Sequence, residues 1–488
     1  MTSTAIADDV GNPHHVRRWY VLAVVGVAQL MVVLDATIVN IALPSAQADL
    51  GFSNGSRQWV ITAYALAFGG LLLLGGRLSD LFGRKWTFIA GLIGFSIASA
   101  IGGSAQSFEV LVLARALQGA FGAILAPAAL SILTTTFSDP DERGKAFAIF
   151  GAISGGGAAI GLLLGGILTE YLSWRWCLYV NLFFAIPTAI VALGLIKNVA
   201  SAAHAGLDIP GTILGCGGLL LLVFGFSKAE TAGWGAPVTL AMLGGAVLLL
   251  ILFFLWLRHA AHPLLPLRIV EDRNRGGSFL TILIAGLGIF GVFLFLTYFM
   301  QQNLGFSPIQ TGFAFLPMVF CIVGASLTAQ TRILPRTGPR PLVVTGMLLA
   351  AAGMIYLAQL DFSSTYLPSV LPALLLLGTG FGSIFATAIN TATLGVIPED
   401  AGVASALVST CQQVGGAAGT ALLSSLAATA TASFLVGEAA SPTLSAEAAI
   451  HGYTVAFWAS AAIFVSGAIF GRVLLRGGPN LTLADSAT

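Results

Sequence analysis

Long apolar runs separated by short polar segments dominate the chain. A helix that spans a bilayer needs roughly 20 mostly apolar residues, and fourteen stretches reach that length. They lie at 19–43, 58–79, 87–105, 108–129, 144–168, 175–196, 209–227, 237–257, 277–301, 309–331, 340–359, 367–393, 402–424 and 451–475. The pattern predicts an all-α, polytopic membrane protein with fourteen transmembrane helices.

The positive charges give an independent test of this topology. Cytoplasmic loops carry an excess of Lys and Arg. With a cytoplasmic N-terminus, all but four of the 21 Lys and Arg residues fall in cytoplasmic loops or at cytoplasmic helix ends. The four exceptions are Arg57, Arg115, Arg175 and Lys228. We therefore expect a multi-pass protein of the cytoplasmic membrane with both termini in the cytoplasm.

The two ends of the chain repeat each other at nearly one offset. Three residues after the second span, Arg77, Gly83 and Lys85, recur 255 positions later as Arg332, Gly338 and Arg340. Phe121–Gly122 recurs 260 positions later as Phe381–Gly382, and the Pro-Asp-Glu of 140–142 recurs 258 positions later as the Pro-Glu-Asp of 398–400. Parallel repeats of six spans are typical of one class of secondary transporters, which bind substrate near the midplane between the repeats.

The repeat divides the chain into two bundles with two extra spans between them. We predict a cytoplasmic N-terminal tail, a six-helix bundle, two additional helices with flanking cytoplasmic loops, a second six-helix bundle and a cytoplasmic C-terminal tail, at 1–18, 19–196, 197–276, 277–475 and 476–488. The seventh and eighth spans carry no charge inside the membrane and are expected to form a lipid-facing tether. An outer loop is expected at about 425–450.

Composition excludes several other classes of protein. Charged residues make up 8% of the chain, against about 25% in soluble domains, and the mean hydropathy is +0.93. A net charge of +1 without a basic stripe argues against nucleic acid as a partner. The four cysteines lack metal-ligand spacing, and the histidines are scattered, so no metal, cofactor or enzyme site is expected. The expected partners are the bilayer, protons and a hydrophobic small molecule, bound by a monomer.

Two ionisable side chains lie well inside predicted spans. Each costs roughly 2.5–3.5 kcal/mol at a helix centre, which makes it a functional candidate. Asp35 and Arg115 lie at similar depths below the predicted outer ends of the first and fourth spans, ~12 and ~10 Å at 1.5 Å per residue. Asp35 is a candidate proton carrier and Arg115 its partner, the alternative being a purely structural ion pair. Helical spacing places Gln118 and Gly119 on the face of Arg115.

Three segments resemble the major facilitator superfamily, and specifically its 14-span drug:proton antiporters. They are LDATIVNIALP at 34–44, GGRLSDLFGRK at 75–85 and LVLARALQG at 111–119. The resemblance covers essentially the whole chain. It implies a proton-coupled exporter of hydrophobic, often cationic, drugs or antibiotics that works by alternating access and is powered by the proton gradient.

The resemblance also assigns residues outside the charged pair. Asp80, Gly83, Arg84 and Lys85 match the motif that latches the two halves on the cytoplasmic side. In the fifth span, the family's antiporter motif has Gly-Pro where this chain has Gly161-Leu162, so the proline kink is missing and antiport is less firmly implied. Gating or packing roles fall to the glycines of this span, Gly151, Gly155, Gly161 and Gly165.

A substrate cavity is expected between the two bundles. Its candidate lining residues are Met31, Asn40, Tyr64, Phe299, Gln301, Asn390 and Gln413. Aromatic and Met side chains with few fixed polar groups suit a lipophilic substrate of variable shape. Two alternatives remain open, a transporter of a lipid or endogenous metabolite and a membrane sensor or scaffold that moves nothing.

Overall fold

A computed structural model describes residues 13–52, 54–137, 139–197, 208–260, 263–435 and 442–478. Within these residues the chain is helical. The long helices are α1 (Pro13–Leu50), α2 (Asn54–Phe82), α3 (Arg84–Gly103), α4 (Phe108–Thr136), α5 (Pro140–Tyr171), α6 (Trp176–Leu195), α7 (Ile209–Ala232), α8 (Pro237–Leu257), α10 (Arg273–Tyr298), α11 (Pro308–Thr328), α13 (Pro339–Leu357), α14 (Leu371–Thr393), α15 (Ala401–Phe434) and α16 (Pro442–Leu474). Short elements connect them: α9 (Arg268–Glu271), α12 (Leu334–Thr337), the 3-10 turn η4 (Pro398–Asp400) and the π-helical turns η1 (Phe299–Asn303), η2 (Ala329–Ile333) and η3 (Tyr366–Val370).

The described helices agree with the predicted all-α membrane fold. Thirteen of them are long and apolar enough to cross a bilayer, and α5, whose side chains are described only in part, is a further helix of 32 residues. These numbers are consistent with fourteen spans. The prediction of an outer loop at 425–450 was wrong, because α15 continues to Phe434 and α16 starts at Pro442. Alanine is the strongest helix former, and this segment is rich in it.

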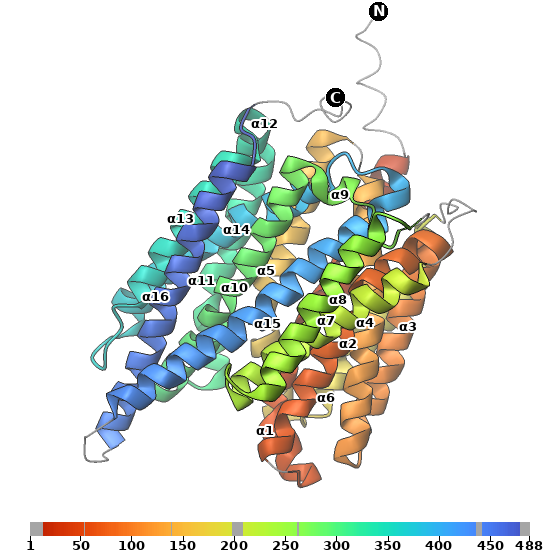
Figure 1. The fold of residues 1–488 in the computed structure, drawn as a ribbon. Helices are drawn as coiled ribbons and strands as arrows, with labels where there is room; N and C mark the ends of the chain where they lie inside the picture. Colours follow the sequence, from red (N-terminus) through yellow and green to blue (C-terminus); the bar gives the residue numbers. More distant parts are fainter. Residues whose placement is uncertain are drawn as a thin grey trace, which may run out of the picture.

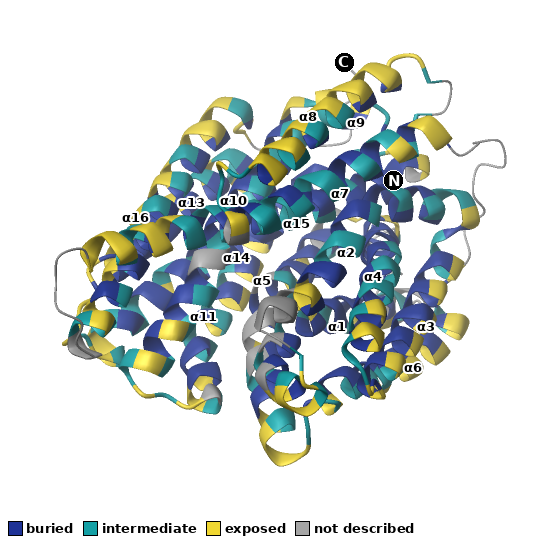
Figure 2. Ribbon diagram, turned by 60° about the horizontal axis from the view of Figure 1, so that its bottom comes forward, coloured by how far each residue is buried: buried dark blue, intermediate teal, exposed yellow. Residues whose placement is uncertain are grey.

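The helices form two bundles that lie side by side (Figure 1). In the first bundle, α1 packs on α4, α5 and α6, and α3 packs on α4 and α6. In the second, α10 packs on α14, α15 and α16, and α13 packs on α14 and α16. Buried residues concentrate along α4 and α14, whereas α6 and α8 show many exposed residues (Figure 2). We call the side where α1 begins and α16 ends the inner face, and the opposite side the outer face.

Two antiparallel seams join the bundles. In one seam α2 packs against α15, and in the other α5 packs against α11 and α14. Glycine permits the close approach in each seam. A Cβ at Gly76 would lie 2.5 Å from the Cβ of Ala406, and one at Gly151 would lie 2.9 Å from the Cα of Ala386. Neither separation leaves room for a side chain, so these contacts require glycine.

The internal repeat extends to backbone conformation. Gly83, between α2 and α3, has φ of 89°, and Gly338, between α12 and α13, has φ of 75°. Both angles lie in the left-handed region that glycine adopts without strain. These are the two glycines that the sequence repeat placed 255 residues apart. The same turn therefore starts the third helix of each bundle.

The two extra helices are not only a lipid-facing tether. Only α8 is largely exposed, and it packs on α7. Helix α7 contacts both α2 and α15, the two partners of one seam. Its Leu220 fills the space beside Gly70, and its Ser227 hydroxyl lies 3.2 Å from that of Thr62 on α2. The expectation of a tether was wrong for α7, because a uniformly apolar helix can pack on protein as well as on lipid.

Candidate functional site

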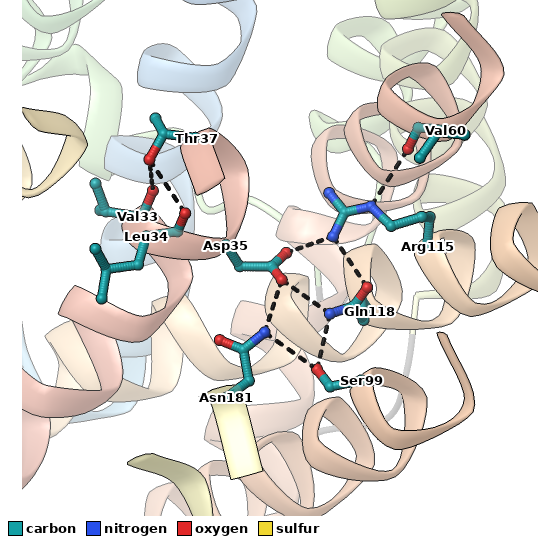
Figure 3. A network of polar contacts seen from close by, with 9 residues as sticks. All are labelled: Val33, Leu34, Asp35, Thr37, Val60, Ser99, Arg115, Gln118 and Asn181. Carbon is teal, nitrogen blue, oxygen red and sulfur yellow. Dashed lines mark hydrogen bonds and ion pairs between the residues drawn. The ribbon is translucent and has the colours of Figure 1, made fainter. Parts of the chain in front are cut away.

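The two ionisable residues predicted within the membrane meet at the centre of the first bundle (Figure 3). The Arg115 guanidinium on α4 donates to Oδ2 of Asp35 on α1 at 2.6 Å. Asp35 has no exposed surface, and Arg115 is 2% exposed. Arg115 also donates to the backbone oxygen of Val60 on α2 at 3.3 Å. The ion pair therefore joins α1, α2 and α4 away from solvent.

A ring of neutral polar groups completes the site. Gln118 accepts from Arg115 at 2.9 Å through Oε1, and it donates through Nε2 to Oδ1 of Asp35 at 2.9 Å. Asn181 on α6 donates to the same Asp35 oxygen at 2.8 Å. Ser99 on α3 accepts from both amides, at 2.7 Å from Gln118 and 3.3 Å from Asn181. Five helices thus contribute to one polar cluster (Figure 3).

The cluster has the hydrogen-bond pattern of an ionised carboxylate. Every side-chain partner of Asp35 donates to it, and an ionised carboxylate only accepts. A proton on Asp35 would face one of these donors, and it would leave Arg115 buried without a counter-charge. An uncompensated buried charge is strongly destabilising. Protonation of Asp35 is therefore incompatible with this arrangement and requires the cluster to rearrange.

Tyr64 covers the guanidinium from α2. The centre of its ring lies 4.4 Å from Cζ of Arg115, a cation–π distance. It stacks on Phe68 with ring centres 5.5 Å apart. Within the described part of the chain, the buried Tyr64 hydroxyl has no hydrogen-bond partner. This places one unused polar group beside the ion pair.

The predicted glycines hold the surrounding helices close together. A side chain at Gly119 would meet the backbone oxygen of Tyr64, so this glycine lets α4 approach α2. A side chain at Gly161 would meet the Thr37 hydroxyl, and a Cβ at Gly165 would lie 2.9 Å from Ile38, so both let α5 approach α1.

A second polar contact closes the inner end of the α2–α15 seam. Asp80, near the end of α2, accepts from the backbone nitrogens of Gly402 at 2.9 Å and Val403 at 3.1 Å. These nitrogens belong to the first turn of α15, where a helix has unpaired N–H groups and a positive dipole end. The carboxylate therefore binds the opposite bundle through the backbone, as the sequence predicted for the latch.

The other residues of the latch motif shape the turn after α2. Gly83 supplies the positive φ described above. Arg84 lies within electrostatic reach of Asp80 and Glu399. Lys85 donates to the backbone oxygen of Leu193 at 2.6 Å, near the end of α6, where helix carbonyls lack partners. Only Asp80 and Arg84 of this motif thus reach the second bundle.

The predicted cavity residues do not gather at one place. Met31 and Phe299 are fully buried, and Gln301 is partly exposed in η1. Gln413 on α15 approaches Gly69 of α2. Asn390 on α14 hydrogen-bonds with Arg143 and Gln330 near the inner face.

Two predicted positions and the metal question need separate mention. Asn40 and Gly155 lie outside the residues whose side chains are described. Across the described chain, no three His, Cys, Asp or Glu residues come together in a way that could hold a metal ion.

The sequence did not reveal Ser99 and Asn181. Serine is common in membrane helices, and only the partners of a polar side chain show its role. A weak signal existed for Asn181, because few amides lie in the middle of the apolar spans. Its partner Asp35 lies 146 residues away along the chain.

Comparisons with known proteins agree with this architecture. Residues 25–420 match the model of the Major Facilitator Superfamily. The chain is 52% identical over 462 residues to a puromycin resistance protein of Streptomyces alboniger, covering 94% of this chain and 92% of the relative. It is 40% identical over 399 residues to a cephamycin export protein of Amycolatopsis lactamdurans, covering 81% and 82%. A tetracenomycin C resistance and export protein of Streptomyces glaucescens is 35% identical, covering 84% and 76%.

Solved structures with the same fold are also transporters. A human organic anion transporter has a TM-score of 0.64 at 18% identity, with 94% of this chain and 100% of that one covered. A proton:xylose symporter has a TM-score of 0.65 at 15% identity, with 97% and 98% covered. These relatives are carriers of small molecules and not enzymes. By its sequence match over most of its length and by its fold, the chain belongs to the major facilitator superfamily.

Proposed function

We propose that the chain is a proton-coupled antiporter that exports hydrophobic antibiotics, cationic ones among them, across the cytoplasmic membrane. The observation that carries this proposal is the buried Asp35–Arg115 pair. It is the only pair of ionisable residues in the middle of the predicted spans, where isolated charges are costly. The functions for which the relatives are named, resistance to or export of puromycin, cephamycin and tetracenomycin C, support the class of cargo.

The proposed cycle uses two states of Asp35. The inner face is assigned to the cytoplasm because it carries most of the positive charges. With the inner face closed by Asp80, Asp35 is ionised. A proton that arrives from outside neutralises a carboxylate oxygen, breaks the bond to Arg115 and favours rearrangement of α1 against α4. The inner face then opens, substrate binds from the cytoplasm, and the proton leaves to the cytoplasmic side.

The proton gradient supplies the energy, with no bound cofactor. One charge that crosses 100 mV contributes about 2.3 kcal/mol. We propose a monomer as the working unit. The unpaired Tyr64 hydroxyl beside the pair offers a hydrogen bond to a substrate that approaches Arg115. Antiport fits this scheme because substrate and proton use opposite conformations.

Transport by the purified protein tests the proposal directly. The protein is reconstituted in liposomes, and puromycin is supplied on the side of the membrane that the inner face of the protein contacts. We expect an imposed proton gradient to drive puromycin across the membrane, toward the outer face and against its concentration gradient. A protonophore should abolish this movement. If neither puromycin nor other lipophilic antibiotics move in response to the gradient, the drug-export proposal fails. Movement that persists without the gradient would instead remove the proton from the mechanism.

A further inference from the structure

The second seam has a buried arginine at its inner end, where the first seam has Asp80. Arg143, in the first turn of α5, donates from Nε to Oδ1 of Asn390 and from a terminal nitrogen to Oγ of Thr393, each at 2.9 Å. Both acceptors lie on α14 of the opposite bundle. The other terminal nitrogen donates to the backbone oxygen of Thr134 on α4, at 3.2 Å. One guanidinium therefore connects both bundles.

The internal repeat relates this contact to the Asp80 latch. The offset of 258 residues that maps 140–142 onto 398–400 also maps Gly144 onto Gly402. Gly402 donates to Asp80, whereas a Cβ at Gly144 would lie 3.2 Å from the backbone oxygen of Gln330. The offset of 255 maps Asp80 onto Pro335, so the second bundle lacks the equivalent carboxylate. The two seams thus have equivalent positions and opposite chemistry.

Arg143 has no counter-charge in the described part of the chain. It is 7% exposed, and no ion pair between described residues includes it. Its remaining contact is the ring of Phe147, 4.5 Å from Cζ. A buried charge held by neutral groups keeps part of its desolvation cost. That cost is relieved when the inner face opens and water reaches the guanidinium.

We infer that Arg143 is a second inner latch, which closes the α5–α14 seam through neutral acceptors and is therefore held shut less firmly than an ion pair would be. Its hydrogen bonds favour the closed inner face, and the uncompensated charge favours opening. The balance makes Arg143 a determinant of how often the inner face opens. The inference rests on the proposed alternating access, but the opening can be measured without any transport.

A single substitution should turn the weak latch into a firm one. Asn390→Asp keeps the side-chain shape and places a carboxylate 2.9 Å from Nε of Arg143. Asn390 also donates to Oε1 of Gln330 at 2.8 Å, and a carboxylate cannot. The Nε2 of Gln330 has no partner within the described residues. A rotation of that amide lets Gln330 donate to the new carboxylate, so the variant is expected to fold.

Thr387 provides a reporter for opening. It lies one turn before Asn390 on the same face of α14, is fully buried, and its hydroxyl has no partner within the described residues. Thr387→Cys is introduced after the four native cysteines have been replaced. The rate of its reaction with N-ethylmaleimide in inside-out vesicles reports exposure of the seam. Asn274→Asp is the matched control. Asn274 is buried on α10 near the inner face, and its Oδ1 accepts from the backbone nitrogen of Arg476 in its own bundle.

The experiment compares four variants with the parent: Asn390→Asp, Arg143→Ala, the double variant of these two, and Asn274→Asp. We expect Asn390→Asp to slow labelling about tenfold and Arg143→Ala to accelerate it severalfold, the usual range for coupling between states. In the Arg143→Ala background, Asn390→Asp should no longer slow labelling, and Asn274→Asp should change nothing. Unchanged labelling in Arg143→Ala, or slowing by Asn390→Asp that survives the loss of Arg143, would overturn the proposal. If Asn390→Asp does not fold, Arg143→Ala still decides. Because labelling needs no substrate, failure here is distinct from failure of drug export.

Discussion

The two bundles share one fold but differ in the ionisable side chains that lie within the membrane. The first holds Asp35, Arg115 and their ring of amides in its centre. The second has no Asp, Glu, Lys or Arg at 277–331, 341–360, 362–398, 401–435 or 448–471. Only the first bundle therefore has a carboxylate in the middle of its spans that a proton can neutralise. We propose that the contacts of the seams, Asp80 in one and Arg143 in the other, transmit that change to the second bundle.

Removal of Arg115 should have the largest effect. Arg115→Met leaves Asp35 buried without its counter-charge, a loss of about 3–5 kcal/mol when one partner of a buried pair is removed. We expect a large fall in thermal stability in detergent and no gradient-driven transport. A partly exposed pair at the outer end of the bundle gives the control. Arg175→Met breaks a 3.0 Å ion pair with Asp49 and a hydrogen bond to Ala105, and it should cost clearly less than Arg115→Met.

Removal of both charges separates stability from coupling. The double variant Asp35→Asn/Arg115→Met leaves no buried charge, so its stability should return close to that of the parent. Transport should remain absent because no group is left to carry the proton. A double variant that is as unstable as Arg115→Met alone would show that the pair is not the source of the loss.

Substitution of Asn181 should shift the pH dependence of transport. Asn181→Leu removes one donor to the ionised form of Asp35, and a hydrogen bond to a charged group contributes about 1.5–3 kcal/mol. The protonated form then becomes easier to reach. The pH of half-maximal transport should move upward by roughly one unit, which corresponds to 1.36 kcal/mol. Asn274→Leu, the equivalent change in the second bundle, should leave the pH profile in place.

Asp80 should affect the rate of transport but not its coupling to the proton gradient. A carboxylate at a helix N-terminus is worth typically 0.3–1 kcal/mol, so Asp80→Asn should slow transport only severalfold. Initial rates with and without an imposed proton gradient give both quantities. Transport that no longer responds to the gradient would mean that Asp80 takes part in proton coupling. Asp361→Asn, in an exposed outer loop, controls for loss of a carboxylate.

A cross-link between α7 and the first bundle should have the smallest effect. Thr62 and Ser227 have hydroxyl oxygens 3.2 Å apart, and α7 is expected to move with α2. A disulfide in Thr62→Cys/Ser227→Cys should therefore leave the transport rate nearly unchanged. A link between Val223→Cys and Gln413→Cys, which both approach Gly69, should stop transport because Gln413 belongs to the other bundle. Equal inhibition by both links would contradict this assignment of α7.

The features that could be predicted from the sequence depend on residues that are unusual in their surroundings. A charge in an apolar run identified Asp35 and Arg115, and a turn motif identified Asp80. The spacing of apolar runs identified the helices. The role of Arg143 could not be predicted, because a positive charge near the inner face is expected from topology alone. Helix α7 was hidden for another reason, since an apolar helix with no polar face does not show which side packs on protein.

The most direct test of the account is whether Asp35 couples drug and proton movement. Proton release is measured in inside-out vesicles upon addition of puromycin or a lipophilic cationic dye, for the parent and for Asp35→Asn. Asp49→Asn, on the same helix but exposed at its outer end, is the control. We predict release with the parent and with Asp49→Asn, and none with Asp35→Asn. An undiminished response in Asp35→Asn would contradict the central claim that this carboxylate carries the proton.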